Sequence, residues 1–205
     1  MTARGRFITF EGIDGAGKST QIETVAETLR ARAVPLVITR EPGGTPLGER
    51  LRELILNEAM VPDAETLLLF AARSQHLAAV IRPALAAGRW VLCDRFTDAT
   101  YAYQCGGRGV AAERIGALER WVHPDVQPDL TLLFDVPPAV AAQRLARVRT
   151  ADRFESETIA FFEAVRREYV QRATREPQRF RVLDGTLSPN VLAATLHEWF
   201  ATWNG

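Results

Sequence analysis

The chain has 205 residues, of which 47% are hydrophobic and 24% are charged, and its formal net charge at pH 7 is zero. This size and composition predict one globular domain over residues 1–205. The balanced charge argues against a nucleic-acid-binding or membrane-surface protein, because these carry clustered excess basic residues. We therefore expect no nucleic-acid or membrane partner, and we interpret an arginine cluster as a site for a small anion.

The chain shows no signal for membrane insertion, secretion or a metal site built from cysteine and histidine. Its longest apolar run, LLLFAA at residues 67–72, is too short to span a bilayer. The first residues, MTARGRFITF, lack the hydrophobic region and cleavage site of a secretory signal. The two cysteines form no CxxC pair and the three histidines are scattered. These features predict a soluble, cytoplasmic protein.

Short apolar runs alternate along the chain with amphipathic stretches. The runs are continuous, as in strands buried on both faces, and we expect strands at Arg6–Glu11, Pro35–Arg40, Trp90–Asp94, Leu130–Asp135 and Phe180–Asp184. Helical patterns cover Lys18–Ala33, Pro46–Asn57, Ala64–Ala87, Ala111–Val122, Pro138–Val148, Ser156–Thr174 and Ser188–Trp203. This alternation predicts an α/β fold in which a five-stranded parallel sheet has helices on both faces.

Charged residues end all five predicted strands. They are Glu11, Arg40, Asp94, Asp135 and Asp184. In parallel sheets ligands bind beyond the carboxyl ends of the strands. We therefore expect the functional site at this edge.

The first strand leads into GIDGAGKS, which fits the phosphate-binding pattern G-x-x-x-x-G-K-[ST]. Its glycines let successive backbone N–H groups face phosphate oxygens, and the next helix adds the positive end of its dipole. A glycine-rich turn before an ordinary helix is the alternative, but the motif lies between a strand and a helix as the phosphate site requires. The predicted ATP-binding residues here are Gly12, Ile13, Asp14, Gly15, Ala16, Gly17, Lys18, Ser19 and Thr20.

Lys18 is the only lysine among 25 lysine and arginine residues. An ammonium group is a compact charge, whereas a guanidinium is a planar fork, and a loop closed around a triphosphate has room for the compact group only. We expect Lys18 to contact the β- and γ-phosphates and the Ser19 hydroxyl to bind Mg²⁺. With no second lysine the chain cannot contain the N-K-x-D motif of GTPases, and its size leaves little room for the coupling domains of a motor. A small kinase is the better interpretation.

Asp94 and Arg95 end the third predicted strand. Asp94 is expected to face Mg²⁺ or its water shell, and Arg95 to bind a phosphate with its guanidinium fork. A surface ion pair is the alternative, but the position at a strand end favours function.

A second group of arginines lies between two helical patterns and predicts a lid over residues 146–156. Such a lid would close on the polyphosphate, stabilise developing charge and exclude water. A solvated basic face is the alternative for any one of these arginines. The expected catalytic set joins Lys18 and Arg95 to these lid arginines. It consists of Lys18, Arg95, Arg147, Arg149 and Arg153.

Phe70 and Arg73 lie three residues apart on a predicted helix and so share a face. A ring that stacks on a base and a fork that bonds its edge would make a nucleobase pocket. A core phenylalanine beside an exposed arginine has the same spacing, and spacing alone leaves both interpretations open.

Together these residues resemble one family closely, the bacterial thymidylate kinases among the P-loop nucleoside monophosphate kinases. The resemblance covers nearly the whole chain and rests on FEGIDGAGKST, TREPGGTPLGE, FAARSQH, VLCDRF, AYQCGGRG, PDLTLLFDV and DRFE, in that order. It implies the P-loop NTPase fold and transfer of the γ-phosphoryl group of ATP to dTMP. The products would be dTDP and ADP, for dTTP biosynthesis. It also implies a Mg²⁺ cofactor and a homodimer.

The resemblance also implies roles for individual residues. Arg95 would hold the dTMP phosphate, Phe70 would stack on thymine and Arg73 would bond its edge. Asp14 would face the acceptor's sugar or its magnesium, and Asp184 would lie near adenine. The further residues expected at dTMP are Glu41, Thr100, Tyr103 and Gln104.

Three local features refine these expectations. Gly15 and Ala16 follow Asp14, so the phosphate loop has no additional basic residue and the lid arginines must supply that charge. The Glu41–Pro42 peptide bond is expected to be cis, as in the family. Phe96 stands where the family commonly has tyrosine or histidine, so a polar contact is lost there.

Two other functions remain as alternatives. A deoxynucleoside kinase would phosphorylate a neutral sugar hydroxyl and would benefit from a carboxylate base, for which Glu41 is the candidate. A non-catalytic ATP-gated binding module would bind ATP without transferring it. A phosphate acceptor, by contrast, is already an anion at pH 7 and needs no base, so catalysis would consist of positioning and charge stabilisation.

Overall fold

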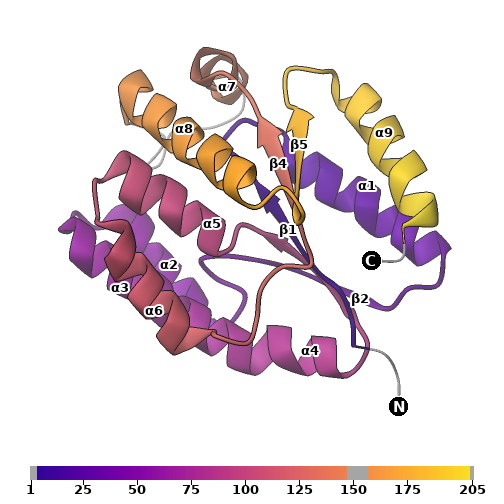
Figure 1. The fold of residues 1–205 in the computed structure, drawn as a ribbon, viewed down its shortest axis with the longest axis horizontal. Coiled ribbons are helices and arrows are strands. Elements are labelled where there is room, and N and C mark those ends of the chain that lie inside the picture. Colours follow the sequence, from indigo (N-terminus) through magenta and orange to yellow (C-terminus); the bar gives the residue numbers. More distant parts are fainter. Residues whose placement is uncertain (1–3, 147–156, 204–205) are drawn as a thin grey trace.

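The computed structural model describes residues 4–146 and 157–203, and its core is a five-stranded parallel sheet (Figure 1). The strand order is β2-β3-β1-β4-β5. The prediction of an α/β fold with five parallel strands is confirmed, and each strand begins within one residue of its predicted start. The strands are β1 (Phe7–Glu11), β2 (Leu36–Arg40), β3 (Trp90–Asp94), β4 (Leu130–Asp135) and β5 (Phe180–Asp184).

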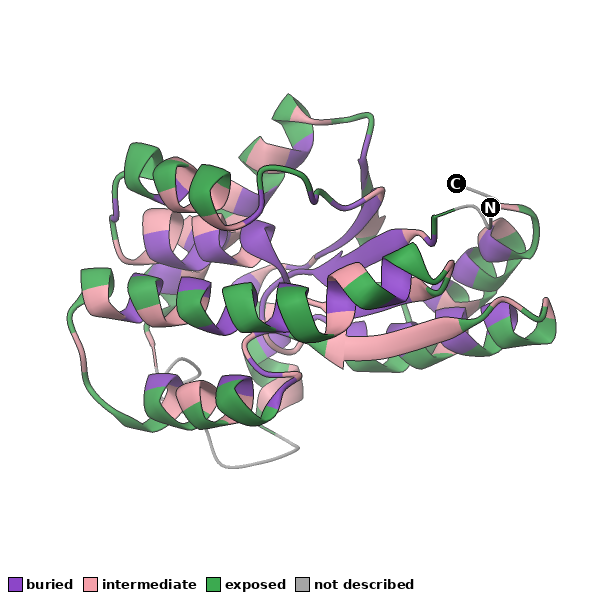
Figure 2. Cartoon of the chain, turned by 90° about the horizontal axis from the view of Figure 1, so that it is seen from below, coloured by how far each residue is buried: buried purple, intermediate pink, exposed green. Residues whose placement is uncertain are grey.

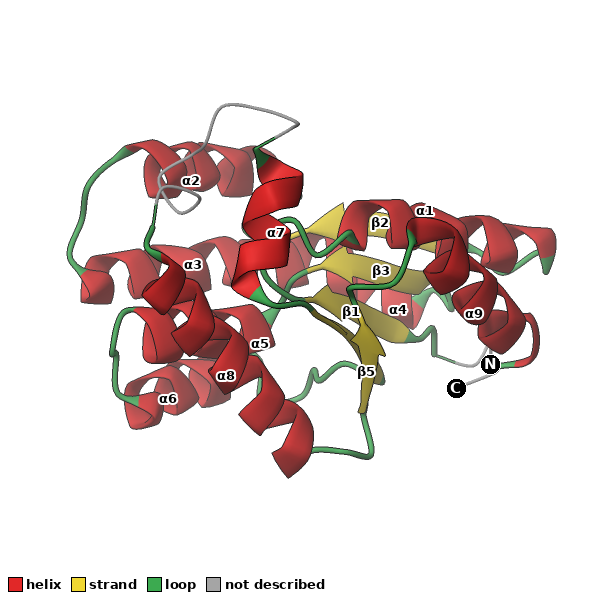
Figure 3. Cartoon of the chain, turned by 90° about the horizontal axis from the view of Figure 1, so that it is seen from above, coloured by secondary structure: helices red, strands yellow, loops and turns green. Residues whose placement is uncertain are grey.

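Helices cover both faces of the sheet (Figures 1 and 3). α1 and α9 pack together on one face, whereas α4 and α8 contact strands on the other. The α-helices are α1 (Lys18–Ala31), α2 (Pro46–Asn57), α3 (Pro62–His76), α4 (Arg82–Ala86), α5 (Thr97–Thr100), α6 (Ala112–Val122), α7 (Pro138–Leu145), α8 (Ile159–Arg175) and α9 (Pro189–Thr202). Two π-helical segments are η1 (Leu77–Ile81) and η2 (Tyr101–Gly107).

The single helix predicted over Ala64–Ala87 is divided in the structure into α3, η1 and α4. Pro83 lies at the start of α4, where it has no N–H to donate and its ring would press on the preceding turn. The widened turn of η1 accommodates it, and the Arg82 N–H donates to the Leu77 carbonyl, five residues earlier. The periodicity predicted the helix correctly but not this widening.

The core lies where β1, β3 and β4 meet the helices, and buried positions concentrate on these three strands and on the inner sides of the helices (Figure 2). All five residues of β1 are buried. Phe10 of β1 and Phe134 of β4 stack with their ring centroids 6.4 Å apart. Because β1 is fixed on both sides, the loop that follows it has a rigid starting point.

The carboxyl ends of the strands form the edge from which the site is built, and α7 lies beyond that edge (Figure 1). Asp94 is in register with both Phe10 and Arg40, and Asp135 is in register with Asp184. Glu11 ends β1 one position further on. Among residues 4–146 and 157–203, no helix combines the length and the apolar character needed to cross a bilayer.

Candidate functional site

The loop between β1 and α1 forms a cradle of backbone N–H groups. Gly12, Gly15 and Gly17 have φ values of 135°, 82° and 91°, a region that side chains with a β-carbon rarely adopt. A β-carbon at Gly12 would lie 2.6 Å from the Phe134 carbonyl oxygen, and one at Gly15 would lie 2.6 Å from that of Ala141. Within residues 4–146 and 157–203 no side chain caps the start of α1, so its first N–H groups can bind an anion.

Lys18 is held inside this cradle by the carbonyl groups of the loop. Its Nζ lies 3.2 Å from the Gly12 oxygen, 3.4 Å from the Ile13 oxygen and 3.9 Å from Asp94 Oδ1. The pKa of Lys18 is lowered by burial and by the positive charge of Arg95. Nearby carboxylates oppose this shift but do not outweigh it. The ammonium is thus positioned before any ligand binds.

Asp94 and Ser19 have the chemistry that a magnesium ion requires. Asp94 Oδ1 is buried and has no hydrogen-bond partner among the described residues, while Ser19 lies exposed in the first turn of α1. Carboxylate and hydroxyl oxygens suit Mg²⁺, which uses few protein ligands beside substrate phosphates. The described ranges contain no group of three or more His, Cys, Asp or Glu side chains that could hold a metal, and the predicted pair fits a phosphate-bound ion.

Beside the cradle lies a cavity that opens to solvent, with about 660 Å³ of space including its open mouth, walled by the loops after β1, β2 and β3 and by α2, α3, α5 and η2. Seven of the eight residues predicted to bind dTMP line it, and Phe70 is the exception. Arg52 joins them from α2, donating from Nη1 to the Pro42 carbonyl at 3.0 Å. The polar lining residues are Asp14, Glu41, Arg52, Arg73, Arg95, Thr100, Tyr103 and Gln104.

Arg95 lies between the cradle and the cavity. Its Nη2 donates to Asp14 Oδ1 at 3.0 Å and to the Tyr103 hydroxyl at 3.0 Å, and its Nη1 donates to the Tyr169 hydroxyl at 3.3 Å. Burial alone would raise the pKa of Asp14, but Arg95 and Lys18 outweigh it and lower that pKa to about 2. Asp14 is therefore an anion at neutral pH and holds the Arg95 fork at the cavity wall.

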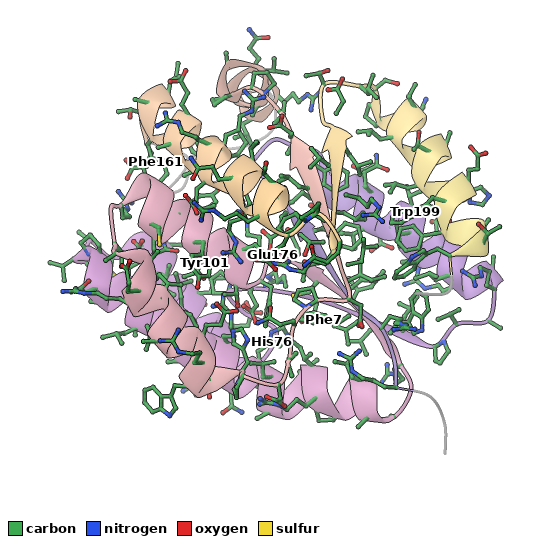
Figure 4. The ribbon with its side chains drawn as sticks, in the orientation of Figure 1. Phe7, His76, Tyr101, Phe161, Glu176 and Trp199 are labelled. Atoms are coloured by element: carbon green, nitrogen blue, oxygen red, sulfur yellow. The ribbon has the colours of Figure 1, made fainter. Side chains whose placement is uncertain are left out.

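Arg73, Glu41 and His76 form a buried hydrogen-bonded cluster, of which Arg73 and Glu41 line the cavity (Figure 4 labels His76). Glu41 accepts from Arg73 Nε at 2.7 Å, and its other oxygen lies 2.9 Å from His76 Nδ1. The second ring nitrogen of His76 lies 2.7 Å from the Thr39 hydroxyl. Burial would raise the pKa of Glu41, but Arg73 and His76 lower it. Both oxygens of this carboxylate are therefore engaged.

Arg73 and Gln104 each offer a polar group of the cavity wall to a ligand. Arg73 Nη2 donates to the Thr100 hydroxyl at 2.9 Å, but Arg73 Nη1 is buried and has no hydrogen-bond partner among the described residues. Gln104 Nε2 donates to Glu65 Oε1 at 2.8 Å. Since a carboxylate only accepts, this bond fixes the orientation of the Gln104 amide and leaves its carbonyl oxygen as an acceptor.

A family model described as thymidylate kinase matches residues 10–195. The chain belongs to the thymidylate kinase family. It is 62% identical to the thymidylate kinase of Methylobacillus flagellatus over 182 residues, which covers 89% of this chain and 90% of that one. The thymidylate kinase of Cupriavidus metallidurans is also 62% identical, over 97% of this chain and 99% of its own.

A solved structure agrees with this family assignment. The crystal structure of thymidylate kinase from Ehrlichia chaffeensis superposes with a TM-score of 0.78 at 33% identity, covering 96% of this chain and 98% of that one. The P-loop fold expected from the sequence is thus confirmed, together with the resemblance on which the expectation partly rested.

In this thymidylate kinase family member the ring of Phe70 lies outside the cavity lining. Phe70 is 2% exposed and packs between the Arg73 guanidinium, 4.8 Å from its centroid, and the ring of His123, 6.4 Å away. Leu69 lines the cavity instead, beside Ile55 of α2. Residues three and four before Arg73 both flank it on the helix, so the stacking of Phe70 on the base stays a prediction, with Leu69 as the second candidate.

Phe96, the departure from the family pattern, is fully buried and forms part of the cavity wall. It packs edge-to-face on Phe7, with ring centroids 4.9 Å apart, and the Arg73 guanidinium lies 5.0 Å from its ring. Here an aromatic face thus supports Arg73. The expected cis peptide bond between Glu41 and Pro42 is present.

Asp184, which was expected near adenine, bonds within its own turn. Its Oδ1 accepts from the Thr186 N–H at 2.9 Å and the Thr186 hydroxyl at 2.6 Å, and these bonds lower its pKa. Arg144 of α7 joins this turn to the cradle, donating to the carbonyls of Gly185 at 2.8 Å and Gly15 at 3.4 Å. The predicted lid arginines Arg147, Arg149 and Arg153 lie outside the described residues.

Four residues near the site were not predicted from the sequence. Arg52 and Arg144 lie on helices among other arginines, and no local motif distinguishes them from their neighbours. The other two reach the site only through the fold. The four residues are Arg52, Leu69, Arg144 and Tyr169.

Proposed function

We propose that this chain transfers the γ-phosphoryl group of ATP to dTMP in the cytoplasm, forming dTDP and ADP for dTTP biosynthesis. The observation that carries the proposal is the hydrogen bond between Asp14 of the phosphate cradle and Arg95 of the adjoining cavity, 3.0 Å long. It places a guanidinium fork, suited to an acceptor phosphate, directly beside the loop that holds the donor phosphates.

The side chains support positioning and charge stabilisation as the basis of catalysis. Lys18 would neutralise the β- and γ-phosphates inside the cradle, and Arg95 would hold the acceptor phosphate in line with them. Ser19 and Asp94 would hold Mg²⁺, which would supply positive charge against the donor phosphates. The lid arginines Arg147, Arg149 and Arg153 would contribute the remaining positive charge in the proposed 146–156 segment.

Glu41 is poorly suited to act as the general base of a deoxynucleoside kinase. Both of its oxygens are engaged, one by Arg73 and the other by His76, and its pKa is lowered. A base must be free to accept the proton of the attacking hydroxyl. This engagement favours a phosphate acceptor, which needs no base.

The free groups of the cavity favour a thymine-like base. Arg73 Nη1 is a donor without a partner in the described part of the chain, and the Gln104 carbonyl is an acceptor. A base that presents a keto oxygen next to an N–H satisfies both, whereas cytosine presents an amino group beside an unprotonated nitrogen. Tyr103 and Thr100 would face the sugar and base, and Asp184 and Arg144 would lie near adenine.

The function is tested by offering dTMP, dCMP and thymidine as acceptors with ATP and Mg²⁺, following ADP release and identifying the product. We expect dTMP to be the preferred acceptor and kcat/KM for dCMP to be about 100-fold lower, from two mismatched hydrogen bonds. Turnover of thymidine without turnover of dTMP would establish a deoxynucleoside kinase instead. ATP binding without any phosphorylated product would establish a non-catalytic binding module.

Leu69 and Phe70 provide a matched pair of variants. Leu69→Ala is expected to raise the KM for dTMP about tenfold, because it removes apolar contact from the cavity wall. Phe70→Ala is expected to lower the free energy of unfolding by about 3 kcal/mol, because it creates a cavity in the core. Steady-state kinetics and urea unfolding measure the two effects. If Phe70→Ala remains folded and raises the KM for dTMP more than Leu69→Ala does, Phe70 is the residue that stacks on the base.

We also infer that the chain forms a homodimer through the side of α2, α3 and α6. Three large apolar side chains on these neighbouring helices are exposed to solvent, and a second copy of the chain would cover them. Their exposed fractions are 46% for Leu54, 56% for Leu67 and 81% for Trp121. Light scattering on the purified protein measures the mass directly.

A further inference from the structure

Glu11 is a fully buried carboxyl group that is not itself one of the residues lining the cavity. It ends β1, immediately before the cradle. Its Oε1 accepts from the backbone N–H of Phe96 at 2.7 Å, and its Oε2 accepts from the Tyr169 hydroxyl at 2.8 Å. A buried acid requires such partners, and each of these two partners is joined directly to one further residue.

That residue is Arg95. Phe96 follows Arg95 in the chain, so its N–H belongs to the peptide unit on the carboxyl side of Arg95. The Tyr169 hydroxyl accepts from Arg95 Nη1 at 3.3 Å, while Phe10 accepts from the Arg95 N–H at 3.0 Å. The last two residues of β1 thus fix the backbone on both sides of Arg95, and Glu11 fixes one of its side-chain partners as well.

Arg95 needs such support because its backbone is strained. Its φ is 69°, in the left-handed region that residues with a β-carbon avoid at a cost of about 1–2 kcal/mol. This turn directs the guanidinium back across the end of β1 to Asp14. Burial and the nearby carboxylate of Asp98 raise the pKa of Glu11 to about 8. Ionising this buried carboxyl group is therefore costly, and its hydrogen bonds with Phe96 and Tyr169 offset part of the cost of burying it.

We propose that Glu11 is a positioning residue for the acceptor phosphate, acting through Arg95 by holding the Phe96 N–H and the Tyr169 hydroxyl. The inference rests on the proposed function, in which Arg95 binds that phosphate. Without Glu11 the strained turn loses its anchor and Tyr169 loses the acceptor for its proton. The guanidinium then leaves the position from which both prongs of its fork reach a phosphate.

The proposal is tested by the affinity for dTMP relative to thymidine, which differ only in the phosphate. Glu11→Leu removes both acceptors at similar volume, and Tyr169→Phe removes the side-chain connection alone. In calorimetric titrations both variants are expected to bind dTMP about tenfold more weakly, with thymidine affinity and ATP affinity unchanged. Glu11→Gln keeps an acceptor for the Phe96 N–H and is expected to retain part of the dTMP affinity.

Thr9→Val is the matched control, since Thr9 is an equally buried polar residue of β1 whose hydroxyl lies 2.9 Å from that of Thr131 in β4. It should lower stability without changing the ratio of dTMP to thymidine affinity. An unchanged ratio in Tyr169→Phe, or an equal loss of dTMP and thymidine affinity in the variants that fold, would overturn the proposal. Failure of the wild-type protein to phosphorylate dTMP would count against the function itself, independently of these variants.

Discussion

Lys18→Met is expected to lower kcat by about 10³-fold, with the fold retained. The substitution removes the one ammonium of the cradle, whose Nζ lies 3.2 Å from the Gly12 oxygen and 3.4 Å from the Ile13 oxygen. Methionine has a similar length and is apolar, so the buried site stays filled while the charge on the transferring phosphoryl group is no longer stabilised. Single-turnover kinetics with excess ATP measures the loss, and circular dichroism checks the fold.

Lys18→Arg is the informative companion, because this chain uses arginine at its 24 other basic positions. The Lys18 side chain is 6% exposed and enclosed by the loop, so the larger planar guanidinium has no room without moving the cradle. We expect at least a 100-fold loss of kcat for this variant also. Activity within tenfold of wild type in Lys18→Arg would mean that charge alone, and not the compact shape of the ammonium, is what the cradle requires.

Arg73→Ala is expected to raise the KM for dTMP about 100-fold and to leave the KM for ATP within twofold. The variant loses the free Nη1 donor of the cavity, and charge-assisted hydrogen bonds to a ligand contribute about 1.5–3 kcal/mol. It also leaves the Glu41 carboxylate buried with His76 as its remaining side-chain partner, which should lower the free energy of unfolding by about 3 kcal/mol. Arg82→Ala is the control, since Arg82 pairs with Asp125 at the surface.

The stability loss of Arg73→Ala should depend on pH in a defined direction. In the wild-type fold Arg73 and His76 lower the pKa of Glu41 below its ordinary value of 4.5. Glu41 therefore contributes stability above pH 4.5, and this contribution is lost as the pH falls through the folded-state pKa. The difference between wild type and variant should be largest near neutral pH and smaller in acid. Equal KM increases for dTMP and ATP would contradict the placement of Arg73 in the acceptor cavity.

The strands and the phosphate cradle could be predicted from the sequence because their signals are local. A strand buried on both faces is a continuous apolar run, and the cradle needs glycines and a lysine at fixed spacing. For the helix that contains Pro83, the sequence predicted the approximate ends correctly but not the π-helical segment in its interior. Proline carried that signal, but helical periodicity does not show how a turn widens to accept it.

The choice between Leu69 and Phe70 could not be made from the sequence, because two neighbours on one helix face differ only in what packs against them. The partnership of Glu11 with Tyr169 joins residues 158 positions apart, and no local pattern indicates it. The pairing of Arg73 with Glu41 spans 32 positions. The cradle and the pair Asp94 and Arg95 lie in local motifs, whereas contacts between distant positions are recognised only in the folded chain.

The π-helical segment η2 has a consequence for how this pocket can vary. It carries Tyr103 and Gln104, and it packs closely on α8, where a β-carbon at Gly107 would lie 2.4 Å from the Phe161 ring. A π-helical turn contains one residue more than an α-helical turn. Deletion of one residue would tighten it and rotate the side chains beyond the deletion by about 100° about the helix axis. Substitutions along η2 can therefore change the specificity of the pocket, whereas insertions or deletions in η2 would displace its side chains.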